Sequence, residues 1–317
     1  MEGPVSRTTL VRIGVASLAI IAAGLAGPAS LSAQPWVPAR GEGSVSLVYQ
    51  NYYVVGHYDL EGKQNTNGAT HTKSVAAELE VGLTDTVALT VGLPFISSKY
   101  TGPPSYSVAG KETTPGPLDN GSYHGAFQDF RVDVRKLFSI GAVPVAPFAG
   151  VTFPSHEYET RGEAVPGRHR PELVVGASAG GALGRFLPAA YAQVRAAVGT
   201  MPELDGFSAV RTTIDLEGGY AVTNRVTVRG LLGWQFRIKG PLAPELFGDW
   251  EHHDRFIVGN YFNAGGGTTI SLTRSFDLYG IWISTLSGKN GAHASRSLAV
   301  GASWSFGGGF SGFGDIE

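Results

Sequence analysis

The tripeptide HAS, at His293–Ser295, places a base and a nucleophile two residues apart. On a β-strand, residues i and i+2 share a face, so the imidazole could take the proton of the serine hydroxyl. Such a pair would suit the hydrolysis of an ester or a lipid. Its use depends on which face of the strand it occupies, and therefore on the fold.

The eight histidines offer a second chemistry, the binding of a divalent metal ion or a response to pH. The densest group is HHD, at His252–Asp254. Neighbouring residues of an extended segment point apart, which makes His252 and His253 poor joint ligands of one ion. Polar residues also collect in loops because water is there, so we expect no metal site and no cofactor. All eight lie in predicted long loops or at the strand ends beside them: His57, His71, His124, His156, His169, His252, His253 and His293.

A third pattern is a ladder of charges in GAFQDFRVDVRKLF, from Gly125 to Phe138. Because side chains alternate between the two faces of a strand, this segment has one charged and one apolar face. The charged face carries Asp129, Arg131, Asp133 and Arg135. The apolar face carries Phe130, Val132, Val134 and Phe138. A soluble sandwich with its charges in water, or a membrane barrel with its charges in the lumen, would each produce this pattern.

Composition and the N-terminus narrow the choice. The chain has 24 basic and 26 acidic residues, which gives no electrostatic case for nucleic acid, and it has no cysteine for a disulfide. Arg7 and Arg12 precede an apolar run at Ile13–Gly27, and small residues follow to Ala33. This order is typical of a secretory signal peptide, and the run is shorter than the ~20 residues of a spanning helix. We predict cleavage after Ala33, so that the mature chain begins at Gln34.

Alternation and turn residues predict about twelve strands, an even number as in bacterial outer-membrane barrels. They span 43–55, 70–81, 86–100, 124–138, 143–153, 172–183, 189–199, 209–220, 225–239, 255–272, 276–285 and 295–306. Their connections alternate in length. The short turns are GLTD, SIGA, RFLP, AVTN and TRS, and the long polar loops include those that begin at Gly56, Thr101 and Ser155. This rhythm favours a membrane barrel with short periplasmic turns over a Greek-key sandwich.

The two faces of the strands agree with a barrel. Apolar side chains share one face of two strands and are expected to meet lipid: Val87, Leu89, Val91, Leu93 and Phe95, then Val226, Val228, Leu232, Trp234, Phe236 and Ile238. Charged side chains are expected to line the lumen as the permeation path: Glu78, Glu80, Asp129, Arg131, Asp133, Arg135, Arg195, Arg211, Asp215, Glu217, Arg229 and Arg237. Aromatic residues near the short turns predict an interfacial girdle: Phe138, Phe186, Tyr191, Tyr220, Phe276, Tyr279, Trp304 and Phe306.

The ladder segment and the VPVAPFAGVTFPS that follows it resemble a family of outer-membrane channels linked to meta-pathway phenol degradation, itself distantly like long-chain fatty-acid transporters. The likeness runs across most of the mature chain. It rests on Gly125, Asp129, Arg135, Gly150, Val151 and Pro154, and on the turns VGLTDTVALTVGLPF and GGYAVTNRVTV. The resemblance implies passage of small, often hydrophobic molecules.

Two features depart from that family. The chain has Pro154-Ser155-His156 where such proteins tend to have Pro-Thr-Gly. Its last strand ends at Phe306 and is followed by the tail GGGFSGFGDIE, whereas an aromatic residue at the C-terminus commonly serves barrel assembly. Recognition by the barrel-assembly machinery is therefore expected to be atypical.

The expected protein is an all-β, antiparallel up-and-down transmembrane barrel: a signal peptide at 1–33, the barrel at 34–306 and a glycine-rich tail at 307–317. We expect a passive channel, not an enzyme, in the outer membrane of a Gram-negative bacterium. Its partners would be a small solute, membrane lipid with lipopolysaccharide, and the assembly machinery.

Two alternatives stay open. The first is a lipid-hydrolysing barrel enzyme that uses His293 and Ser295. The lipid face of their strand is even-numbered from Leu298 to Phe306, so this odd-numbered pair is expected at the lumen or in a loop, away from lipid. The second alternative is a structural or adhesive barrel whose long loops do the work.

Overall fold

The computed structural model describes residues 35–102, 107–108, 111–112, 116–184, 187–246 and 252–307. The predicted signal peptide, its cleavage site between Ala33 and Gln34, and the tail beyond Gly307 lie outside these residues. So do Arg185 and Phe186 of one short turn. Across the described part of the chain, no helix is both long enough and apolar enough to cross a membrane.

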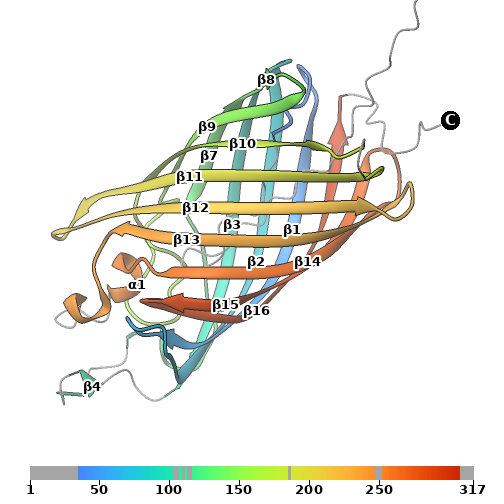
Figure 1. Cartoon of the computed structure of the whole chain (residues 1–317). Coiled ribbons are helices and arrows are strands. Elements are labelled where there is room, and N and C mark those ends of the chain that lie inside the picture. Colours follow the sequence, from blue (N-terminus) through green and yellow to red (C-terminus); the bar gives the residue numbers. More distant parts are fainter. Residues whose placement is uncertain are drawn as a thin grey trace, which may run out of the picture.

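The described residues form a closed antiparallel barrel in which neighbours along the chain are neighbours in the sheet (Figure 1). Three short strands, β6 (His124–Phe127), β7 (Phe130–Lys136) and β8 (Phe138–Ile140), are pieces of one crossing, so the barrel has twelve crossings. The others are β1 (Gly43–Tyr58), β2 (Gln64–Thr84), β3 (Val87–Thr101), β9 (Val143–Phe153), β10 (Glu172–Ala182), β11 (Ala190–Leu204), β12 (Phe207–Ala221), β13 (Val226–Lys239), β14 (Asn260–Ser271), β15 (Phe276–Lys289) and β16 (Gly291–Phe306). Pairing of β16 with β1 closes the ring. The predicted fold class is confirmed.

Four small elements lie beyond the wall. β4 (Ser107–Val108) and β5 (Lys111–Glu112) pair with each other in the β3–β6 connection. The 3₁₀ helix η1 (Ala243–Leu246) and the one-turn helix α1 (His253–Phe256) lie between β13 and β14. The predicted strand at 255–272 is therefore too long at its start, because Arg255 belongs to α1 and the strand begins at Asn260.

The alternation of faces follows the sequence pattern. On β3 the odd-numbered residues, Leu89 among them, are half-exposed or exposed, whereas the even-numbered ones are buried. On β13, Val228, Leu232, Phe236 and Ile238 are exposed on the outer surface. Apolar side chains on the outer surface and polar ones within match a barrel that meets lipid, because lipid leaves an outward charge without a partner.

The fourth crossing is not one regular strand. The pairing of Phe95 with Phe127 and of Gly92 with Arg131 leaves one extra residue on this crossing, a β-bulge between β6 and β7. Pro94 lies opposite the bulge and accepts the Gln128 N–H at 2.9 Å, but it has no N–H to return. The missing donor explains where the strand is interrupted. The bulge moves Asp129 off the face that Arg131, Asp133 and Arg135 share.

The predicted strict alternation of short and long connections is wrong at the outer end, defined here as the end opposite the short turns. Only Asp59–Lys63 separates β1 from β2, Asp205–Gly206 separates β11 from β12, and Asn290 separates β15 from β16. These strands extend beyond the apolar band of the barrel, because polar residues continue the backbone hydrogen bonds between strands past it. Long connections remain after β3, β9 and β13.

The predicted aromatic girdle holds in part. Phe138, Tyr220 and Trp304 are exposed on the outer surface. Tyr191 and Tyr279 instead point into the barrel, where both are buried. Each ring covers a glycine directly across the ladder, Gly219 and Gly301, and a Cβ on either glycine would overlap the ring. These two tyrosines fill the space that the glycines leave, and do not anchor the barrel at the membrane surface.

Candidate functional site: the lumen and its outer plug

A layer of charged side chains narrows the lumen toward the short-turn end. It surrounds a cavity of ≈ 10 Å³, about the room of one water molecule. Three carboxylates and three guanidinium groups line this cavity: Glu78, Glu80, Asp133, Arg131, Arg135 and Arg195. We call these six residues the constriction.

Salt bridges hold the constriction together. Arg135 on β7 pairs with Glu80 on β2, and Arg131 Nη2 lies 2.7 Å from Asp133 Oδ2. Strand β3 runs between β2 and β7 and presents the small Gly92 and Thr90 at this level, so the long side chains on either side can meet across it. The Arg195 guanidinium lies 4.0 Å from the centre of the Phe148 ring, a distance at which cation and ring attract.

The remaining predicted lumen residues lie around this layer. Asp215 is directly opposite Arg195 in the ladder. Toward the short turns, Glu217 lies 3.6 Å from Arg229 and also accepts the Tyr191 hydroxyl. Toward the outer end, Arg211 makes two hydrogen bonds to Glu172, of 2.7 and 2.8 Å.

Two predicted lumen residues have other roles. Arg237 donates to the carbonyl of Gly240 at 2.6 Å, where the chain leaves the wall. Asp129, displaced by the bulge, accepts the Tyr158 hydroxyl at 2.6 Å. Of the four charged residues on this segment, Arg131, Asp133 and Arg135 therefore lie in the constriction. Asp129 instead contacts the loop 154–171.

One side of the lumen contains an apolar cluster. Val48, Leu231, Tyr279, Ile281, Ile283 and Ala299 form a buried cluster on the inner face of β1, β13, β15 and β16. Most of the charged lumen residues lie on β2, β7, β11 and β12, and Arg229 of β13 is a further buried charge. A molecule inside the barrel would therefore meet an apolar surface and a charged one.

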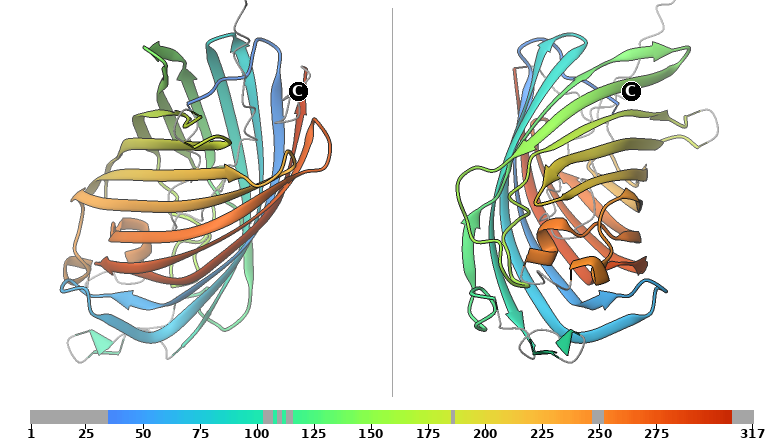
Figure 2. Two further views of the ribbon diagram at one scale, coloured as in Figure 1. Left: turned by 45° about the vertical axis from the view of Figure 1, so that its right-hand side comes forward. Right: turned by 90° about the vertical axis from the view of Figure 1, so that its left-hand side faces the viewer.

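Much of the long loop 154–171 folds inward at the outer end. Residues 162–168 are buried without interruption. The Thr70 hydroxyl of β2 donates to the Glu163 carbonyl at 3.2 Å, and Ala164 and Val165 pack with Tyr100 of β3. Segment 252–259, with α1, lies beside this loop on the lumen side of the barrel end (Figure 2). We call residues 154–171 and 252–259 the plug.

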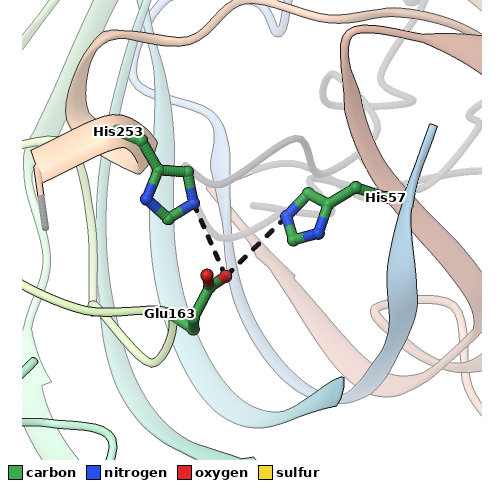
Figure 3. A group of neighbouring side chains, drawn as sticks. All are labelled: His57, Glu163 and His253. Carbon is green, nitrogen blue, oxygen red and sulfur yellow. Dashed lines mark ion pairs between the residues drawn. The ribbon is translucent and has the colours of Figure 1, made fainter. Parts of the chain in front are cut away.

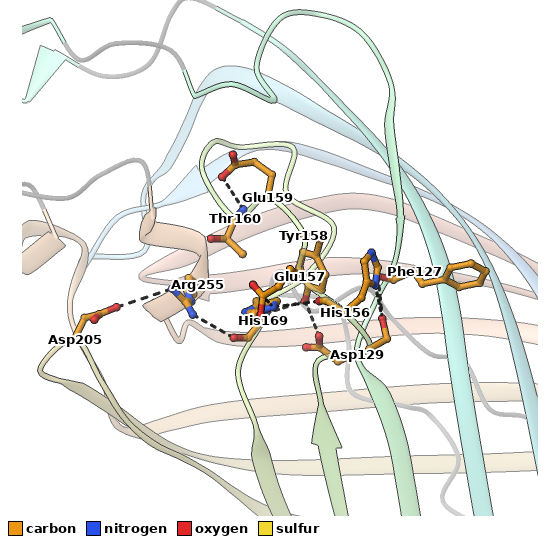
Figure 4. Close-up of polar contacts among 11 residues, drawn as sticks. Phe127, Asp129, His156, Glu157, Tyr158, Glu159, Thr160, His169, Asp205 and Arg255 are labelled. Carbon is orange, nitrogen blue, oxygen red and sulfur yellow. Dashed lines mark hydrogen bonds and ion pairs between the residues drawn. The ribbon is translucent and has the colours of Figure 1, made fainter.

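Hydrogen bonds tie the plug to the wall on several sides (Figure 4). The Tyr158 hydroxyl bridges Asp129, at 2.6 Å, and the backbone N–H of His169, at 2.8 Å. Arg255 of α1 donates to the His169 carbonyl at 3.3 Å and lies 3.9 Å from Asp205 in the β11–β12 turn. The two parts of the plug therefore hold each other as well as the wall.

One buried charge lies within the plug and a half-buried one lies beside it. The Arg170 guanidinium donates to the carbonyls of Pro202 and Phe207, at 2.5 and 2.8 Å, and burial lowers its pKa to about 10. Asp119 accepts the backbone N–H groups of Glu163 and Ala164, at 2.8 and 3.2 Å. Burial raises the pKa of Asp119 to about 6, although these two donors act to lower it.

Most of the charged side chains that the sequence assigned to the lumen are buried inside the barrel, and their part in permeation stays a prediction, but the sequence analysis missed the plug. The loop 154–171 is polar, which predicts a solvated loop, yet it carries Gly162 at φ +123° beside the buried Glu163. A side chain at residue 162 would meet the Asp119 carboxylate. No pattern within the loop indicates that its partners lie on β2, β3 and β11.

The pair His293 and Ser295 is placed differently from the prediction. In the pairing of β16 with β1, Tyr53 faces Arg296 and Val54 faces Ala294, so Ser295 is an extra residue that reverses the alternation. Ala292 and Ala294 consequently occupy the buried side. The Ser295 hydroxyl donates to the Tyr53 carbonyl at 3.2 Å, and His293 Nδ1 contacts Gln64. Each side chain is thus engaged with another residue.

Comparison with known proteins gives a fold and no sequence family. No family model matches the chain, and no curated protein matches it. The chain is similar to the crystal structure of the COG4313 outer membrane channel from Pseudomonas putida F1. The TM-score is 0.68 at 14% identity, over 86% of this chain and 98% of that one. The chain has the fold of that outer-membrane barrel.

Other barrels align less closely. The translocator domain of the autotransporter NalP from Neisseria meningitidis gives a TM-score of 0.47 at 8% identity, over 85% of this chain and 90% of that one. The NanC porin gives 0.46 at 9% identity, over 82% and 98%.

Proposed function

We propose that the protein is a passive outer-membrane channel for small molecules. The observation that carries the proposal is the charged and polar interior of a barrel whose outer surface is apolar. Charged side chains inside a membrane protein are costly unless they pair with one another or line a water-filled path. The similarity in fold to a COG4313 outer membrane channel supports the same role.

The two-sided lumen favours small amphipathic solutes, aromatic acids above all. The apolar cluster around Leu231 and Ile281 would accept a ring, and arginines such as Arg195 and Arg211 would accept a carboxylate. The sequence resemblance to channels linked to phenol degradation supports the same class of solute. The constriction and the plug would both have to move as the solute passes, because the cavity between the six constriction residues is ≈ 10 Å³.

This function places the barrel in the outer membrane of a Gram-negative bacterium. The predicted signal peptide would export the chain, and the assembly machinery would insert it. The apolar residues of the outer surface, such as Leu232 and Phe236, would then contact lipid, and the outer end would contact lipopolysaccharide.

Neither alternative function gains support. A hydrolase would need His293 to activate Ser295, but the Ser295 hydroxyl donates to the Tyr53 carbonyl. An adhesive barrel would use projecting loops. Of the described outer connections, three are tight turns and the loop 154–171 folds inward.

Liposome swelling tests the proposal. Liposomes that contain the folded protein would be diluted into isotonic sugars, amino acids and aromatic carboxylates. We expect swelling with benzoate-like acids to exceed that with sugars of similar mass, and a weakened plug to increase both. Swelling no faster than in protein-free liposomes, for every solute and for a plug variant that is folded, would contradict a channel.

A further inference from the structure

Three side chains that are distant in the sequence converge where the plug meets the wall (Figure 3). His57 comes from β1, Glu163 from the loop 154–171 and His253 from α1. Glu163 and His253 are 3% and 1% exposed, and His57 is 23% exposed. Glu163 Oε2 lies 3.5 Å from His253 Nε2 and 3.8 Å from His57 Nε2.

We propose that His57, Glu163 and His253 bind a divalent transition-metal ion, Zn²⁺ in the first instance, which fastens the plug to the barrel wall. Two imidazole nitrogens and one carboxylate oxygen form a ligand set that suits Zn²⁺, whereas Ca²⁺ and Mg²⁺ prefer oxygen ligands alone. Fastening of the plug by this ion is a function in addition to the passage of solutes.

The distances are close to those that coordination needs. Zn–N and Zn–O bonds of about 2.0–2.1 Å at tetrahedral angles separate neighbouring ligand atoms by roughly 3.3 Å. The three ligand atoms all lie within 4.8 Å of one another, and both Glu163 pairs are nearer than that. The partly exposed His57 has the most freedom to close the remaining gap by rotating its side chain.

A second carboxylate near the three ligands supplies the charge balance. Asp254 Oδ1 lies 3.4 Å from His253 Nε2. The carboxylates of Glu163 and Asp254 together carry the two negative charges that neutralise a divalent ion. The fourth position is taken by water, as in zinc sites with three protein ligands.

The central ligand is held in place before any ion binds. The Thr70 hydroxyl holds the Glu163 carbonyl, and Asp119 accepts the N–H groups of Glu163 and Ala164. The left-handed Gly162 directs the chain into this position. Backbone anchoring of this kind orients a ligand much as an outer-shell hydrogen bond does.

Metal binding is measured on the full folded chain in detergent, with no reference to transport. The protein is equilibrated with Zn²⁺ and dialysed, and the bound metal is counted by mass spectrometry. We expect about one Zn²⁺ per chain. Glu163→Gln and His253→Gln should each weaken binding at least 10–100-fold, the loss that outer-shell changes alone produce. His156→Gln, an exposed histidine of the same loop, is the matched control and should keep the full affinity.

Heat-modifiable gel migration of each variant shows that the barrel has folded. A wild-type protein that retains no Zn²⁺, or folded Glu163→Gln and His253→Gln variants that retain as much as His156→Gln, would overturn the site. As a measurement independent of the variants, Co²⁺ is titrated into the wild-type protein. Intense visible bands of a four-coordinate ion, lost on adding one equivalent of Zn²⁺, support the site, and only the weak bands of six-coordinate Co²⁺ refute it.

Discussion

Removing two positive charges from the constriction should make the proposed channel cation-selective. The test variant is Arg131→Gln with Arg135→Gln. Glutamine is chosen because it can still donate a hydrogen bond to the carboxylates that pair with these arginines. In the wild-type constriction three guanidinium groups face three carboxylates, so its formal charge is balanced. The double variant leaves a net charge of −2 on the wall (one positive and three negative groups).

The size of the effect follows from Coulomb's law. An ion about 5 Å from each lost charge gains or loses roughly 0.8 kcal/mol per charge in water, and screening at 0.1 M salt reduces the total to about 1 kcal/mol. The net negative charge of the double variant stabilises a cation by about 1 kcal/mol and destabilises an anion by the same amount. The free energies of the two ions in the constriction therefore differ by about 2 kcal/mol more than in the wild type. The permeability ratio should therefore change roughly 30-fold, since each 1.4 kcal/mol is a factor of ten.

Reversal potentials in a planar bilayer measure this ratio. Under a tenfold KCl gradient the wild type should reverse near zero, and the double variant should approach the limit of about 59 mV for a single charge. Glu78→Gln with Glu80→Gln is the matched control and should shift the potential in the opposite direction. An unchanged potential, in a double variant that assembles and conducts, would remove the constriction from the permeation path.

Three further changes test the fold, the plug and the hydrolase alternative. Leu232→Arg, at the middle of β13 on the lipid face, should destabilise the barrel by about 2–4 kcal/mol, whereas Ile238→Arg near the outer end should cost about 0–1; equal losses in urea unfolding would contradict the assigned depth. Gly162→Ala should displace the plug, because its Cβ would meet Asp119, and should raise conductance, whereas Gly230→Ala enters open space and should not; identical conductance would mean that the loop does not obstruct the lumen. Ser295→Ala should leave the lipids of the host membrane unchanged by thin-layer analysis, and accumulation of intact lipid would revive the hydrolase.

Alternation made the barrel predictable from the sequence. The outward Val228 and the inward Arg229 differ by one position, and that period of two persists along most strands. Because every strand of a closed barrel pairs with its chain neighbours, strands and short turns suffice to predict the topology. The same logic predicted that Arg131, Asp133 and Arg135 share a face.

The sequence predictions that failed depended on contacts between residues outside any one strand. The bulges at Asp129 and Ser295 each insert one residue and reverse the faces beyond it, and only the partner strand reveals the inserted residue. His253 was judged against its neighbour His252 on an assumed extended segment, but it lies in α1 and meets His57 and Glu163 instead. A contact between residues 57, 163 and 253 depends on how the loop 154–171 folds, which no local period encodes.

The claim that molecules cross through the charged lumen has a direct test, because the chain has no native cysteine. Ser178→Cys places a thiol on the inner face of β10 beside the constriction, and Val175→Cys places one on the outer face of the same strand. A charged methanethiosulfonate reagent, added from the aqueous side, should reduce the single-channel current of Ser178→Cys and leave that of Val175→Cys unchanged. Current that persists in Ser178→Cys after mass spectrometry shows full modification of its thiol would contradict a permeation path through this lumen.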